Sequence, residues 1–177
     1  SLILELDVSS DAAFADDIKM RYSLQGYFFR LFGGAIASSA KRQQTVATSS
    51  TEAELLALTF TAKELMAMLR LFNSISLQLD LPIPTIECDN MQTIRLLTAE
   101  LPKIRTLLKN VDVNNCWSRQ ECLKGTFDIK YTPSSQIVAD GFTKLYTRYK
   151  FLHFRNLLQL TDIKPQILIE LESDSEA

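Results

Sequence analysis

The chain has 177 residues, of which 46% are hydrophobic and 23% charged, a composition typical of one globular domain with its own core. No apolar run reaches transmembrane length and no basic-then-apolar signal pattern opens the chain, so we expect neither a membrane span nor secretion. Because the first residue is Ser1 rather than Met, we expect a fragment of a longer protein.

The charge is unevenly distributed along the chain. The 19 basic and 21 acidic residues give a net charge of −2. Four acids without a basic partner lie among the last eight residues: Glu170, Glu172, Asp174 and Glu176. Without them, 17 acids oppose 19 basic residues and the rest carries +2. We therefore expect a folded domain over 1–164 and an acidic, disordered tail over 165–177.

The cysteine and histidine content argues against a zinc site. Cys88, Cys116 and Cys122 form no CxxC pair, and His153 is the only histidine. An odd number of thiols without a secretion signal favours a reducing, intracellular setting. We expect all three cysteines to be buried as small apolar side chains.

Three strands are predicted at the start of the chain. Residues 2–8 alternate as a strand does, and strand character runs on toward 9–14, where Asp11 lies in the polar stretch SSDAAFADD. Residues 23–32 form a second strand, which Gly33-Gly34 connects tightly to the next one. The polar, small-residue segment 35–47 is interpreted as the third strand.

The stretch TSSTEAELLAL, residues 48–58, begins the longest amphipathic segment. Ser49 followed three residues later by Glu52 is a capping box. Apolar residues then recur at helical spacing as far as Phe72, which predicts a helix over about 49–74.

One carboxylate of this helix is placed unusually. Glu54 stands above Leu58 at the edge of the apolar stripe, whereas Glu52 and Glu64 project further from its centre. A carboxylate half turned toward the core needs a hydrogen bond, an ion pair or a metal. The alternative is a second acid that the helix dipole favours.

Shorter elements follow the long helix. Residues 85–88 form a short strand that Asp89 closes, and Asn90 caps a helix over 91–98. Pro102 breaks that helix.

The last part of the chain contains one more strand and three helices. A mostly helical span covers 103–124, and 127–131 alternate as the fifth strand. A helix over 137–145 carries Asp140 near its first turn. The last helix is lined by Phe151, Phe154, Leu157 and Leu158. The order predicts an α/β fold: a mixed five-stranded sheet, three antiparallel strands then two parallel ones, flanked by helices.

Four acids come together in the fold that this order predicts. Asp11 lies at the first strand, Asp89 at the end of the fourth, and Asp140 after the fifth, where the ends of parallel strands form a crevice. Together with Glu54 they would repel one another unless divalent cations lay between them. Oxygen ligands without His or Cys select Mg²⁺ or Mn²⁺, and two such ions support phosphoryl displacement. This predicts a metal-dependent nuclease, although any α/β domain carries acids at strand ends.

A resemblance to a known family rests on seven segments in the family's order: SSDAAFADD, QGYFFRLFGG, KRQQTVATSSTEAELLAL, AKEL, CDNMQTIRLLT, KNVDVNNCWSRQE and VADGFTK. From about Leu6 to Ile163 the chain resembles the ribonuclease H domain of copia-type LTR-retrotransposon Pol polyproteins, most like those of fungi. The resemblance implies the ribonuclease H fold and cleavage of the RNA strand of an RNA–DNA hybrid during reverse transcription.

The same resemblance implies the site and its surroundings. The implied catalytic and metal-binding carboxylates are Asp11, Glu54, Asp89 and Asp140, holding two Mg²⁺ ions, with Mn²⁺ as a substitute. The implied partners are the RNA–DNA hybrid and the reverse transcriptase portion of the same polyprotein. The implied locations are the cytoplasm, a virus-like particle or the nucleus.

Departures from the family pattern keep a second hypothesis open. Where the family reads KHVDIHxHW, this chain has Asn110, Asn114 and Cys116 in place of the histidines. The loop 133–137 also lacks the mobile histidine that assists product release in cellular ribonucleases H. The alternative is a catalytically weakened or domesticated module that binds nucleic acid or protein. An integrase is disfavoured, because integrases place the Glu after two Asp, and Glu54 comes between them here.

Several basic residues are candidate phosphate contacts: Lys41, Arg42, Lys103, Arg105 and Lys109. For any single one of them, a solvated helix face is an equally good explanation. Trp117 is interpreted as a core residue and His153 as a structural one.

Overall fold

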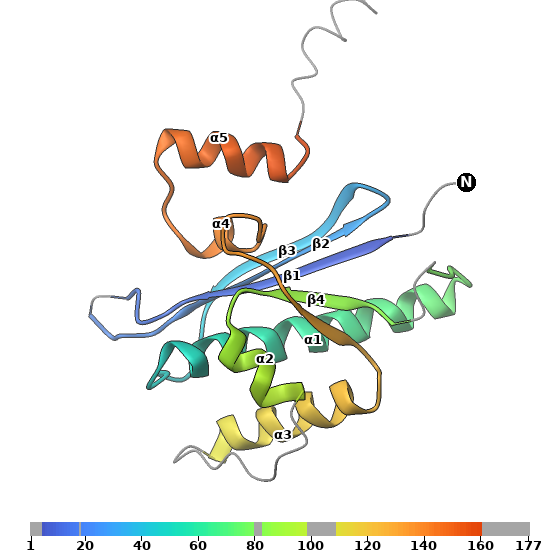
Figure 1. The fold of residues 1–177 in the computed structure, drawn as a ribbon, viewed down its shortest axis with the longest axis horizontal. Coiled ribbons are helices and arrows are strands. Elements are labelled where there is room, and N and C mark those ends of the chain that lie inside the picture. The colour runs from blue at the N-terminus through green and yellow to red at the C-terminus, as the bar shows by residue number, and fades with distance from the viewer. Residues whose placement is uncertain (1–4, 18, 80–82, 99–108, 161–177) are drawn as a thin grey trace, which may run out of the picture.

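The structure is a computed structural model that describes residues 5–17, 19–79, 83–98 and 109–160, with side chains left out for 109–112. Five strands form one sheet in the order β3-β2-β1-β4-β5 (Figure 1). Their bounds are Leu6–Ala13 for β1, Leu24–Leu31 for β2, Gly34–Arg42 for β3, Thr85–Cys88 for β4 and Asp128–Tyr131 for β5. β1, β2 and β3 are antiparallel, whereas β1, β4 and β5 run parallel. The predicted mixed sheet is confirmed.

Helices cover both faces of the sheet. Their bounds are Ser50–Ser74 for α1, Met91–Thr98 for α2, Lys109–Leu123 for α3, Asp140–Thr143 for α4 and Arg148–Leu157 for α5. α1 packs on the sheet with α2 and α3 beyond it, and α4 and α5 lie on the opposite face (Figure 1). Among the described helices, none combines the length and apolar character needed to cross a membrane.

The tight hairpin between β2 and β3 is confirmed, with a shift of one residue. Its two central residues are Phe32 and Gly33, with φ angles of 55° and 79°. Positive φ at both positions is the geometry of a two-residue turn that matches strand twist, and glycine adopts it without strain. β3 then ends at Arg42 rather than at residue 47, because Gln43 turns inward and its Nε2 donates to the Ala53 carbonyl at 2.8 Å.

The start of α1 is confirmed by its cap. The Ser49 hydroxyl accepts the Glu52 N–H at 3.1 Å. The Glu52 carboxylate reaches back to the Thr48 N–H at 2.6 Å, one residue before the position of a standard capping box. The Glu52 side chain is buried, because these bonds hold it against Thr48 at the start of the helix.

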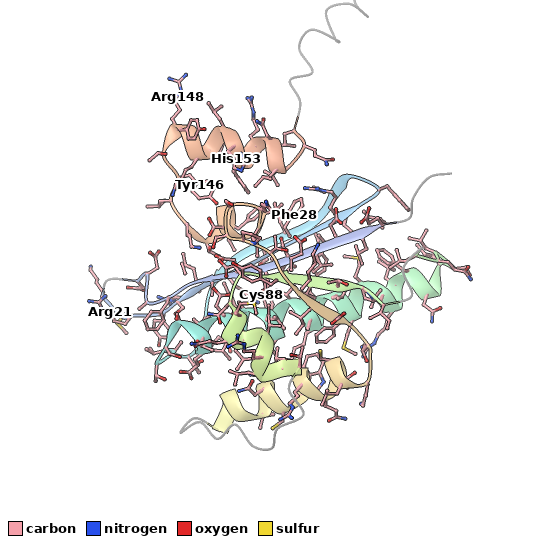
Figure 2. The ribbon with its side chains drawn as sticks, in the orientation of Figure 1. Arg21, Phe28, Cys88, Tyr146, Arg148 and His153 are labelled. Atoms are coloured by element: carbon pink, nitrogen blue, oxygen red, sulfur yellow. The ribbon has the colours of Figure 1, made fainter. Side chains whose placement is uncertain are left out.

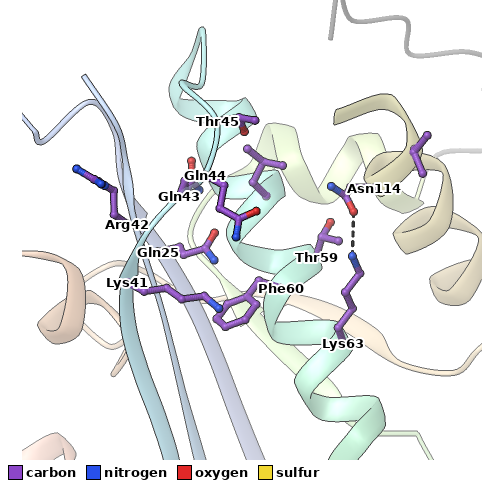
Figure 3. Close-up of a pocket in the computed structure, with 12 residues that line it drawn as sticks. Gln25, Lys41, Arg42, Gln43, Gln44, Thr45, Thr59, Phe60, Lys63 and Asn114 are labelled. Carbon is purple, nitrogen blue, oxygen red and sulfur yellow. Dashed lines mark hydrogen bonds between the residues drawn. The ribbon is translucent and has the colours of Figure 1, made fainter. Parts of the chain in front are cut away.

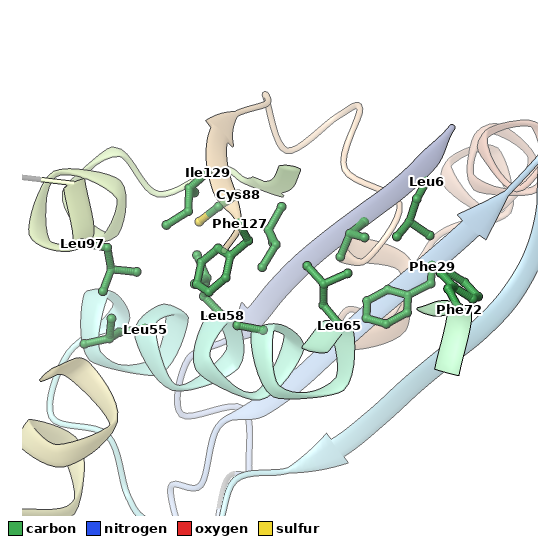
Figure 4. Packing of buried hydrophobic residues seen from close by; sticks show 13 residues of the cluster. Leu6, Phe29, Leu55, Leu58, Leu65, Phe72, Cys88, Leu97, Phe127 and Ile129 are labelled. Atoms are coloured by element: carbon green, nitrogen blue, oxygen red, sulfur yellow. The ribbon is translucent and has the colours of Figure 1, made fainter. Parts of the chain in front are cut away.

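The main core lies between α1 and the sheet (Figure 4). The helix contributes its predicted apolar stripe: Leu55, Leu58, Ala62, Leu65 and Phe72. The sheet contributes Val8, Phe29, Ile86 and Ile129, with Phe127 next to β5. Each fully buried side chain of this size adds about 1.5–3 kcal/mol of stability, so α1 is held by its packing.

A smaller core lies on the opposite face, beneath α5. Phe28 of β2, Val138 and Phe154 of α5 are its buried members, and Phe142 packs against them. The rings of Phe154 and Phe142 meet edge to face, with centroids 5.4 Å apart. Of the residues predicted to line the last helix, Phe154 is buried, whereas Phe151 is 54% exposed.

Two predicted helices differ in extent from the observed ones. The helix over 137–145 is the single turn α4, preceded by turns in which the Gln136 and Ile137 N–H groups both donate to the Pro133 carbonyl. Asp140 is nevertheless its first residue, as expected. The span 103–124 is represented by α3, and its residues 103–108 lie outside the described residues.

Candidate metal centre

Three aspartates meet where the parallel strands end. In the pairing of β1 with β4, Ser9 lies opposite Glu87, so Asp11 falls level with Asp89 two residues further along. Asp140 reaches the same point from the first position of α4. One carboxylate oxygen from each of the three aspartates lies within 4.8 Å of the other two. The structure thus brings these three acids together where the sequence placed them.

Asp11 lies deeper than the sequence suggested. The polar stretch SSDAAFADD continues β1 to Ala13, and Asp11 is fully buried inside that strand. Burial raises the pKa of Asp11, and the ammonium of Lys144 opposes this rise. The Thr143 hydroxyl also donates to its carboxylate.

Glu54 joins the aspartates from α1, across the sheet face. It is 7% exposed, and its Oε1 accepts the Ala12 N–H at 3.3 Å. Its Oε2 is buried and has no hydrogen-bond partner among the described residues. Burial, with the negative charges of Asp11 and Asp89 added to it, raises the pKa of Glu54 to about 9.

The four predicted acids do not form a single group of mutually close ligands. One group contains the three aspartates; the other contains Glu54, Cys88 and Asp89, again with all ligand atoms within 4.8 Å. Asp89 belongs to both groups and links them. Hard oxygen donors together with a buried, unpartnered carboxylate oxygen suit Mg²⁺ or Mn²⁺, so the residues present fit such ions.

Three contacts of Asp11 and Asp140 were not foreseen from the sequence. The Lys144 ammonium contacts Asp140 and lies 3.4 Å from Asp11 Oδ1. The Tyr146 hydroxyl donates to the other oxygen of Asp140. Burial of Lys144 lowers its pKa, but the charges of Asp11 and Asp140 outweigh this, so the pKa is raised. The i, i+4 spacing of Asp140 and Lys144 was a signal that could have identified this pair.

The loop 133–137 contacts both Asp89 and the only histidine. The Ser134 hydroxyl donates to Asp89 Oδ2. His153 of α5 is exposed, and its Nε2 lies 3.1 Å from the Ser135 carbonyl oxygen. The loop has no histidine of its own, but α5 brings His153 against it from 18 residues further along the chain.

A polar groove of about 520 Å³ runs between the end of β3, α1 and α3 (Figure 3). The Lys41 ammonium lies 3.6 Å from the centroid of the Phe60 ring, and Lys63 Nζ donates to Asn114 Oδ1 at 2.9 Å. Arg42 also lines the groove and pairs with Asp17 at 3.3 Å.

The other candidate phosphate contacts cannot be placed in this groove. Lys103 and Arg105 lie outside the described residues, and the same holds for the side chain of Lys109. Lys63, which the sequence did not single out, is the third cation of the groove.

The expectation for the cysteines holds for one of three. Cys88 is buried, whereas Cys116 is exposed and Cys122 is half-buried. Both of these cysteines lie on α3, where Cys122 packs against the main core and Cys116 does not. Trp117 of the same helix packs against the main core, as expected.

The fold matches solved ribonuclease H structures. LC11-RNase H1 in complex with an RNA/DNA hybrid has a TM-score of 0.55 and 13% identity, over 78% of this chain and 93% of that one. The N-terminal ribonuclease H domain of a Mycobacterium tuberculosis protein has a TM-score of 0.54 and 9% identity, over 88% and 97%. The chain therefore has the ribonuclease H fold.

The sequence matches a family of mobile elements. No protein-family model matches the chain. The retrovirus-related Pol polyprotein from transposon TNT 1-94 of Nicotiana tabacum is 34% identical over 142 residues, which is 80% of this chain and 10% of the polyprotein. The chain thus spans about a tenth of such relatives. It has the ribonuclease H fold and is similar in sequence to part of retrotransposon Pol polyproteins, which confirms that part of the resemblance inferred from its sequence. The relative named here is from a plant, and the expected likeness to fungal elements stays a prediction.

Proposed function

We propose that this domain is a divalent-metal-dependent endonuclease that cleaves the RNA strand of RNA–DNA hybrids within a retrotransposon's reverse-transcription machinery. The observation that carries the proposal is the meeting of Asp11, Asp89 and Asp140 within 4.8 Å at the strand ends of a ribonuclease H fold. Residues 1–164 are proposed to form the catalytic domain, and 165–177 an acidic tail. The activity is proposed to be intracellular, with the reverse transcriptase portion of a Pol polyprotein as its partner.

Each acid has a defined part in the proposed site. Asp11 and Asp89 hold cations from adjacent strands, Asp140 holds them from α4, and Glu54 approaches from α1 with a free oxygen. Two bound Mg²⁺ ions, or Mn²⁺ in their place, would supply an activated water and stabilise the leaving oxygen. Thr143 and Tyr146 orient the carboxylates by donating to Asp11 and Asp140.

Three observations support a nucleic-acid substrate. Lys41, Arg42 and Lys63 line one groove, where they could meet the phosphates of a bound strand. The solved structure of LC11-RNase H1, which shares this fold, contains an RNA/DNA hybrid. The chain without its four terminal acids also carries a net charge of +2.

A weakened or domesticated binding module remains the second candidate. It is favoured by Asn114 and Cys116, which replace family histidines, and by the absence of a histidine from loop 133–137. Such a module would bind a hybrid through the groove and cleave it slowly or not at all.

Asp89→Asn tests the proposal. The amide keeps a hydrogen-bond acceptor for Ser134 but removes one ligand charge, so Mg²⁺-dependent cleavage of a labelled RNA–DNA hybrid should fall by several orders of magnitude. In chelator the melting temperature should rise by about 2–4 °C, because removing the negative charge of Asp89 lowers by about 1 kcal/mol the cost of burying Asp11 and Glu54 beside it.

Glu87→Gln is the matched control, since it removes a charge from β4, two residues before Asp89, and Glu87 belongs to neither group of ligands. The proposal fails if Asp89→Asn cleaves as the parent does, or if it melts lower in chelator. A parent that binds the hybrid but does not cleave it in Mg²⁺ or Mn²⁺ would favour the binding module.

A further inference from the structure

A thiol lies at the inner edge of the metal centre. Cys88 is the last residue of β4, directly before Asp89, and it is fully buried against the core (Figures 2 and 4). Its Sγ, one Glu54 oxygen and one Asp89 oxygen all lie within 4.8 Å of one another. A hydrolytic centre that uses only oxygen ligands gives this sulfur no part.

Glu54, a member of the same group, has one oxygen without a hydrogen-bond partner among the described residues. The Glu54 side chain is more than nine-tenths buried, and its Oε2 has no hydrogen-bond partner among the described residues. The group of three aspartates already contains a counter-cation, since Lys144 contacts Asp11 and Asp140. A buried carboxylate without such a partner is costly, and a cation beside it would remove the cost.

The donor set differs in kind from that of the three aspartates. One sulfur and two carboxylate oxygens are ligands that Zn²⁺ takes in proteins, usually with four ligands in all. Thiolate ligands select Zn²⁺ and related soft cations over Mg²⁺. The Asn90 N–H donates to Cys88 Sγ at 3.4 Å, a contact that orients the sulfur and would stabilise its charged form.

We propose that Glu54, Cys88 and Asp89 form a second cation site, selective for Zn²⁺ or another thiophilic divalent cation, with the fourth position left to water. Binding breaks the S–H bond, releases its proton to solvent and forms a metal–sulfur bond, with no change of oxidation state. Because Asp89 and Glu54 also belong to the proposed hydrolytic centre, Zn²⁺ and Mn²⁺ compete. Inhibition by Zn²⁺ rests on the proposed function, but the binding itself does not.

Cd²⁺ is the probe, because sulfur-to-cadmium charge transfer gives an ultraviolet absorption that oxygen ligands do not. The reduced full chain is used in a Cys116→Ser/Cys122→Ser background, which leaves Cys88 as the only thiol. We expect the absorption to saturate at one Cd²⁺ per chain and to decline as Mn²⁺ is added in excess. In the same background, Glu54→Gln and Asp89→Asn should each weaken Cd²⁺ binding by about tenfold or more, and Cys88→Ser should abolish the absorption.

Three results would overturn the site. They are no absorption in the background protein, absorption that persists in Cys88→Ser, and a Cd²⁺ affinity in both Glu54→Gln and Asp89→Asn that equals the affinity of the background protein. The last would mean a lone thiol binds without the carboxylates. Circular dichroism shows whether Cys88→Ser folds. If it does not, the Cd²⁺ affinities of Glu54→Gln and Asp89→Asn decide whether the site exists. None of these readouts requires cleavage, so an inactive protein would leave this inference standing.

Discussion

Replacing Glu54 by Gln should remove much of the pH dependence of stability in the metal-free protein. Burial and the charges of Asp11 and Asp89 raise the Glu54 pKa from 4.5 to about 9. Between these values the folded chain keeps a proton that the unfolded chain has released. Stability is therefore fully present below about pH 4.5 and is lost as pH rises toward 9.

The expected loss of stability follows from the pH range between the two pKa values of Glu54. Each pH unit inside it costs about 1.4 kcal/mol, so the free energy of unfolding falls by about 3 kcal/mol from pH 5 to pH 7. In a domain of this length that corresponds to roughly 5–10 °C in melting temperature. Gln cannot ionise, and its amide oxygen can still accept the Ala12 N–H. The raised pKa of Asp11 acts in the same direction, so a smaller slope should persist in the variant.

The assay is thermal unfolding in chelator at several values between pH 5 and pH 8. Glu64→Gln is the matched control, because it removes the same charge from a half-buried position on the same helix. The control should follow the parent, and Glu54→Gln should give the flatter profile. Parallel profiles for Glu54→Gln and the parent would refute the argument, since the buried carboxyl would then not keep its proton.

Three further outcomes are expected. Lys144→Gln should bind Mn²⁺ severalfold more tightly by calorimetry, because it removes an ammonium that contacts Asp11 and Asp140; weaker binding would mean that the lysine orients these acids. Gly141→Ala should reduce cleavage and lower the melting temperature, because its Cβ would lie 2.3 Å from the Phe154 ring. Adding Phe154→Leu should recover part of the activity and part of the melting temperature, and no recovery would mean that the clash with Phe154 is not the cause. Deleting the residues after Ile169 removes four acids and should tighten hybrid binding at low salt in a titration series, with the gain fading as salt rises; equal affinities at low salt would contradict this.

Much of the fold was predictable because its signals are local. The Ser49 cap and the apolar stripe of α1 depend on residues three and four positions apart, and both are observed. The first and fifth strands were recognised by alternation, and the order of all five predicted strands restricted the possible sheet. The end of β3 was placed too late, because the inward turn at Gln43 depends on a contact with Ala53 that no local pattern encodes.

The acids of the candidate site could be predicted from the sequence. The contacts that Lys144 and Cys88 make with them could not. Asp89 was located by its position at a strand end and Asp140 by its position in the first turn of a late helix, and the structure brings both to Asp11. Lys144 contacts Asp11 only because the chain crosses to the opposite sheet face before α4. The proximity of Cys88 to Glu54 likewise depends on packing between α1 and β4, which joins residues far apart in the sequence.

The position of Asp140 depends on the second core as much as on the sheet. Gly141, the next residue, leaves space that the Phe154 ring fills, and a Cβ there would overlap that ring. The Phe154 ring of α5 thus packs against the single turn of α4. Lys144 and Tyr146 contact the carboxylate of Asp140 in the same turn. Glu54 reaches the same centre from α1 on the other face. Since the acids are held by two separately packed layers, loosening either layer should change the spacing of the acids before it unfolds the sheet.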